Sequence, residues 1–92
     1  MRIVKDLQID DVHITIFKME HKFTMKLEWK RMEQVFKLDG REGMEDLDKV
    51  LAIIDKGFIQ KVKGTFQFML ENRNERLKAL QEMEDEEFPE II

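Results

Sequence analysis

The segment KFTMKLEWK, residues 22–30, alternates strictly between apolar and polar side chains. Neighbouring side chains of a β-strand point to opposite faces, so a period of two is typical of a half-buried strand. The apolar members of the segment share one face: Phe23, Met25, Leu27 and Trp29. The segment therefore predicts a strand that turns one face to a core and the other to water or to a partner.

Three further segments, RIVKDLQI, VHITIFKM and MEQVFKLD, extend this strand into a sheet. Their expected inward positions are Ile3, Leu7, Ile9, Val12, Ile14, Ile16, Met32, Phe36 and Leu38. Short polar connections separate the four segments, and Lys30–Arg31 serves as a tight turn although it lacks Gly and Asn. Short connections favour an antiparallel meander, in which consecutive strands are neighbours.

The period changes after Gly43, where apolar residues begin to recur at helical spacing. The first helix carries Leu47, Val50, Leu51 and Ile54, and Asp55–Lys56–Gly57 is its expected end. Gly57 is suited to the left-handed position that follows many helices.

Residues 58–70 fit two structures. A helix gathers Phe58, Ile59, Val62, Phe66, Met69 and Leu70 into one stripe, whereas a hairpin turning at Lys63–Gly64 leaves Ile59 and Met69 outside. We favour the helix, continued through residues 71–87. The predicted fold class is α+β, with a four-stranded antiparallel meander followed by two helices packed on one face (ββββαα), the second of them long.

The length of 92 residues fits a single domain, predicted over residues 1–84, with a flexible acidic tail at 85–92. Residues 82–92 carry six acids and no base, whereas residues 1–38 carry eight bases and six acids. The chain has no Cys, no long apolar run and no leader-like segment, so we expect a cytoplasmic protein without membrane contact.

The residue inventory argues against catalysis. The chain lacks Ser and Cys, the commonest acyl-transfer nucleophiles, and has no phosphate-binding glycine motif. Along one strand, His13 and His21 would lie about 26 Å apart, too far to share a metal ion. We therefore predict no enzyme activity, no catalytic or metal-binding residue and no cofactor. Seven Met and seven Phe could line a small-molecule pocket, but they more often form plain core.

The outward face of the sheet and the far end of the second helix are the candidate interaction surfaces. The candidate interface residues are Phe17, Val35, Leu77, Leu80 and Met83. We predict a protein–protein interaction module that binds itself as a homodimer or binds another protein. The competing interpretation of the outward face is a simple solvated surface.

A nucleic-acid interpretation also remains open. The outward positions and the nearby turn hold a possible stacking ring and basic residues: Phe17, Lys22, Lys26, Lys30, Arg31 and Lys37. A meander followed by a helix resembles, in element order, a family of single-stranded-DNA-binding coactivators. That resemblance implies single-stranded nucleic acid as the alternative partner of the outward face.

Overall fold

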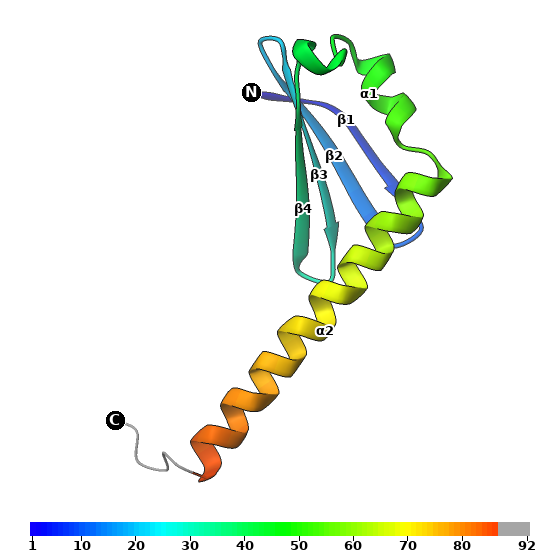
Figure 1. Cartoon of the computed structure of the whole chain (residues 1–92). Helices are drawn as coiled ribbons and strands as arrows, with labels where there is room; N and C mark the ends of the chain where they lie inside the picture. The colour runs from blue at the N-terminus through cyan, green and yellow to red at the C-terminus, as the bar shows by residue number, and fades with distance from the viewer. Residues whose placement is uncertain (87–92) are drawn as a thin grey trace. The chain divides into compact units, whose positions relative to one another are not determined.

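The computed structural model describes residues 1–86 and confirms the predicted ββββαα order (Figure 1). Its elements are β1 (Arg2–Ile9), β2 (Val12–Met19), β3 (Lys22–Trp29), β4 (Met32–Leu38), the short 3₁₀ helix η1 (Gly40–Glu42), α1 (Leu47–Ile53) and α2 (Lys56–Glu86). The predicted acidic tail began at residue 85. Its first two residues belong to α2, and residues 87–92 lie outside the described part of the chain.

The four strands form one antiparallel sheet in the order β1-β2-β3-β4. Two-residue turns join them, as the polar gaps between the strand segments predicted. Lys30 and Arg31 both have positive φ, 47° and 66°, which is what a type I′ turn requires of its two central residues. Gly or Asn is the usual choice at these positions, because a Cβ atom is crowded in the left-handed region.

The strand β1 contains an irregularity that the alternating pattern did not reveal. Ile3 pairs with Phe17 while Lys5 pairs with Ile16, so the extra residue Val4 forms a bulge. The bulge moves Ile3 to the outward side of the sheet, where it is 58% exposed. The prediction of Ile3 as an inward residue is therefore wrong, and half-buried Val4 is the apolar residue beside it.

The inner face of the sheet forms the core of the first compact unit, residues 1–60. Its fully buried side chains come from the central strands: Val12, Ile14, Ile16, Phe23, Met25 and Leu27. Val50 of α1 is also fully buried. The Phe58 ring, in the first turn of α2, lies 5.5 Å from the Phe36 ring of β4, centroid to centroid. Trp29 ends the inner row half-buried, and its indole Nε1 donates to the Asp11 carboxylate at 2.8 Å.

The second compact unit begins at Lys61 and contains most of α2. The helix is continuous through residues 58–70, so the hairpin alternative is wrong. The expected stop at Gly57 is also wrong. Instead, α1 ends at Ile53, and the Asp55 carboxylate accepts from the Phe58 backbone N–H at 2.8 Å, which starts α2 two residues after α1.

Candidate interaction surfaces

The strand register places the outward side chains in three rows that cross the sheet from β1 to β4. The rows are Ile3–Phe17–Thr24–Lys37, Asp6–Thr15–Lys26–Val35 and Gln8–His13–Glu28–Glu33. The first row holds most of the apolar surface, and the third row is polar throughout. The face is therefore a mixed surface rather than a uniform basic one.

Phe17 and Val35, the candidate interface residues of the sheet, lie in different rows on strands that are not neighbours. Phe17 instead pairs with Ile3, which the bulge has turned outward. The Lys26 ammonium lies 5.6 Å from the Phe17 ring centroid, in the range of a cation–π contact. Val35 is 49% exposed on the edge strand β4. The structure thus separates the two predicted residues and gives each a different neighbourhood.

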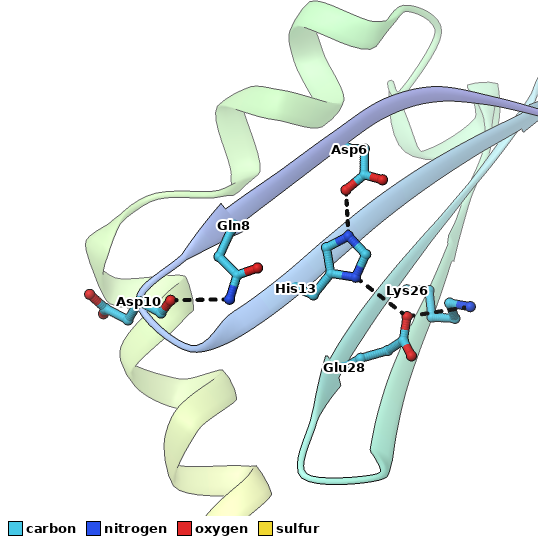
Figure 2. Close-up of polar contacts among 6 residues, drawn as sticks. All are labelled: Asp6, Gln8, Asp10, His13, Lys26 and Glu28. Atoms are coloured by element: carbon cyan, nitrogen blue, oxygen red, sulfur yellow. Dashed lines mark hydrogen bonds and ion pairs between the residues drawn. The ribbon is translucent and has the colours of Figure 1, made fainter.

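A polar cluster surrounds His13 on the same face (Figure 2). The Nε2 atom of His13 contacts the Asp6 carboxylate, and its Nδ1 atom lies 3.7 Å from a Glu28 carboxylate oxygen. That oxygen is also 3.5 Å from the Lys26 ammonium. The four side chains are all partly exposed, so each ion pair contributes little to stability. His13 was expected to be a solvated side chain. It is partly exposed, and its ring contacts the carboxylates of Asp6 and Glu28.

Among the side chains that the structure describes, no group of three or more His, Asp or Glu is arranged to hold a metal ion. His21 lies in the exposed Glu20–His21 turn, away from the His13 network. The predicted lack of enzyme activity stays a prediction.

The basic residues considered for nucleic-acid binding are spread over the whole length of β3. Lys22 begins that strand and Lys30 follows its end, about 26 Å away at the usual rise per residue. The Lys30 ammonium lies 4.6 Å from the Trp29 ring centroid, and Lys26 is held by Phe17 and Glu28. Asp6, Glu28 and Glu33 lie among these bases. This arrangement gives little support to a continuous basic groove with a free stacking ring.

A surface hollow of about 430 Å³ lies at the end of the sheet where Lys22 starts β3. Its lining includes Phe17, Met19, Lys22, Lys37 and Arg41 together with the acids Asp39 and Glu42. Met19, 50% exposed, was not among the predicted interface residues, because it stands at the boundary between strand and turn. The mixed charge of the lining favours neither an anion nor a cation.

Asp39 and Arg41 form a local ion pair at the start of η1. The Asp39 carboxylate accepts from the Arg41 backbone N–H at 2.9 Å and from its guanidinium Nη2 at 2.9 Å. The hydrogen bond from the Arg41 side chain lowers the pKa of Asp39 below its ordinary value. The same contact raises the pKa of Arg41. The pair caps the turn that follows β4.

The second candidate surface is the C-terminal half of α2. Leu77, Leu80 and Met83 are 42%, 51% and 48% exposed, as the sequence predicted. Phe68 is more exposed still, at 72%, and was not singled out because it lies off the apolar stripe. The buried members of α2 are confined to its beginning: Ile59, Val62 and Phe66.

Comparisons with protein-family models, with curated proteins and with solved structures find no match to this chain. Among the described residues, no helix combines the length and the apolar character needed to cross a membrane.

Proposed function

We propose that the chain is a non-catalytic protein–protein interaction module that associates with a second copy of itself. The observation that carries this proposal is the apolar stripe of α2, which continues past its buried part as exposed residues. Leu77 follows Phe66 by about three helical turns, and Leu80 follows Val62 by about five. The exposed leucines are thus on the same face of the helix as the buried residues.

Burying those leucines against a partner is energetically favourable. Full burial of one Leu side chain is worth about 1.5–3 kcal/mol relative to full exposure. Leu77 and Leu80 are each about half exposed, so two copies that pair along this stripe cover four partly exposed leucines together. Met83 adds a flexible side chain that adapts to an uneven surface.

The order of charges along this part of α2 supports pairing with a second copy in the antiparallel sense. Residues 71–78 carry three bases, Arg73, Arg76 and Lys78, against two acids, Glu71 and Glu75, whereas residues 82–86 carry acids and no base. Antiparallel helices place this weakly basic part of one copy beside the acidic part of the other, whereas parallel helices place the two acidic parts together. Opposite charges across an interface favour one orientation over the other.

The test is the mass of the protein in solution, measured by light scattering across a concentration series that reaches high micromolar. We expect the mass of a dimer for the natural sequence and, at equal concentration, a shift toward the mass of a monomer for the double variant Leu77→Asp, Leu80→Asp. Phe68→Asp is the matched control, because Phe68 is exposed but lies away from the stripe. It should remain dimeric.

A monomeric mass for the natural sequence at every concentration would contradict the proposal. The expected cytoplasmic location stays a prediction from the sequence.

A further inference from the structure

The two edges of the sheet differ in how well each could accept another strand. Among the described residues, β1 and β4 each pair on one side only. The bulge at Val4 disturbs β1, and bulges on edge strands hinder pairing with a new strand. β4 keeps a regular register with β3 along its whole length, and Figure 1 shows it at the open edge of the sheet.

The register identifies which residues of β4 direct backbone groups toward that open edge. A two-residue turn is closed by a hydrogen-bonded pair, which is Trp29 and Met32 here. Hydrogen-bonded pairs alternate along antiparallel strands. Glu33, Val35 and Lys37 therefore turn their N–H and C=O groups away from β3 and toward the edge.

In the same three residues, the acid Glu33 and the base Lys37 lie at equal distances on either side of Val35. If two β4 strands pair antiparallel about Val35, the two Val35 residues face each other and Glu33 faces Lys37 of the second copy at both ends. Directly opposed unlike charges stabilise a strand pair. All three side chains are exposed, Val35 at 49%. The backbone groups that this register pairs are the ones that point to the edge.

Neighbouring registers are less favourable because they oppose like charges. Pairing centred on Gln34 would place Arg31 opposite Lys37 of the second copy. Pairing centred on Phe36 would place Glu33 opposite Asp39. Both alternatives carry such a clash twice, because a two-fold axis repeats every contact. The pattern of charges therefore selects one register.

We propose that two copies of the chain join through β4, antiparallel and centred on Val35, so that their sheets become one eight-stranded sheet. This inference rests on the proposed self-association. It adds a second contact between the two copies, formed by residues of β4 rather than of α2. The partner is a second copy of this chain, because the charge complementarity of β4 is to itself.

Two charge reversals test the register. Glu33→Lys and Lys37→Glu should each weaken the dimer about tenfold or more, since each variant turns two attractive pairs into two repulsive ones. An equimolar mixture of the two variants should regain the natural dissociation constant, because every Glu–Lys contact reforms between unlike chains. Lys22→Glu is the matched control: it changes the net charge as Lys37→Glu does, but on the interior strand β3.

A backbone variant gives an independent measurement. Val35→Pro removes an N–H that points away from β3, so the variant should keep its circular-dichroism spectrum while the dimer weakens at least tenfold. Glu33→Lys should also stay folded, because it replaces one of two acids that face each other at Glu28 and Glu33.

The outcomes separate this inference from the proposed function. If the natural chain dimerises and both charge variants keep its dissociation constant, the β4 contact is refuted while self-association stands. If the single variants weaken the dimer but their mixture does not recover it, the register centred on Val35 is refuted. A natural chain that stays monomeric refutes the proposed self-association and this contact with it.

Discussion

The Lys30–Arg31 turn gives a stability prediction whose sign is opposite to that of most substitutions. Arg31 has φ of 66°, in the left-handed region that costs a residue with a Cβ atom about 1–2 kcal/mol. Glycine removes that cost but loses about 0.5–1 kcal/mol through its greater freedom in the unfolded chain. Arg31→Gly should therefore raise the free energy of unfolding by about 0.75 kcal/mol at the centre of these ranges, and by no more than about 1.5 kcal/mol. The contact of Lys30 with the Trp29 ring stays in place.

Urea unfolding followed by circular dichroism measures this change. A small domain has a denaturant slope near 1 kcal/mol/M, so the midpoint should rise by roughly 0.5–1 M. His21→Gly is the matched control, because His21 is also the second residue of a two-residue turn but lies outside the left-handed region. That variant should lose about 0.5–1 kcal/mol. If Arg31→Gly lowers the free energy of unfolding as much as His21→Gly does, the left-handed backbone at Arg31 carries no strain.

Three further predictions concern the core, the cap and the outer face. Ile14→Val should cost about 0.5–1.5 kcal/mol in urea unfolding, because Ile14 is fully buried, whereas Met19→Ala, at a site 50% exposed, should change the same quantity by less than about 0.5 kcal/mol. The lowered pKa of Asp39 means that its carboxylate stabilises the fold fully at neutral pH and loses this effect as pH falls below about 4. The difference in unfolding free energy between the natural chain and Arg41→Gln should accordingly be largest at pH 7 and shrink at about pH 3; a constant difference would contradict it. Fluorescence titration with a labelled single-stranded oligonucleotide should show no saturable binding at about 0.15 M salt, and binding that Lys26→Ala abolishes would restore the nucleic-acid alternative.

Most of the sheet could be predicted because the buried apolar residues of its central strands all lie on one face. Because alternate residues of β2 and β3 are buried, apolar residues recur at every second position of these strands. All six of their fully buried residues were expected to point inward. The bulge at Val4 could not be foreseen in this way. It belongs to a strand in which apolar and charged residues alternate loosely, so the sequence carries no sign of the extra residue. The outward position of Ile3 was missed for that reason.

The helical part was ambiguous because short-range preferences and the longer apolar pattern disagreed. Gly64 and the run Thr65–Phe68 suit a strand, but the 3.6-residue stripe that includes Ile59 and Phe66 is longer than any hairpin explains. Gly57 was misassigned because glycine is strongly enriched just after helix C-termini, whereas here it lies in the first turn of α2. The decisive feature was Asp55, whose carboxylate caps α2.

The candidate site was predicted less well than the fold, because its residues depend on neighbours in three dimensions. The sequence identifies Leu77, Leu80 and Met83 correctly as exposed, since a helical stripe can be followed by counting. It does not show that Lys26 covers Phe17, or that His13 lies between Asp6 and Glu28, because these contacts join different strands. It also gives no warning that β4 is the regular edge of the sheet.

The two proposed contacts share one requirement of symmetry, and this is the strongest reason to prefer a second copy over an unrelated partner. A two-fold axis perpendicular to a strand or helix always makes the paired elements antiparallel. Such pairing is favourable only when residues at equal distances on either side of the centre of the element carry opposite charges, because the two-fold axis brings these residues together. β4 has this property about Val35, with Glu33 and Lys37 at equal distances on either side. The end of α2 has it more weakly, because residues 71–78 carry one more base than acids and residues 82–86 carry acids only. Selection for an unrelated partner would place no such condition on either element.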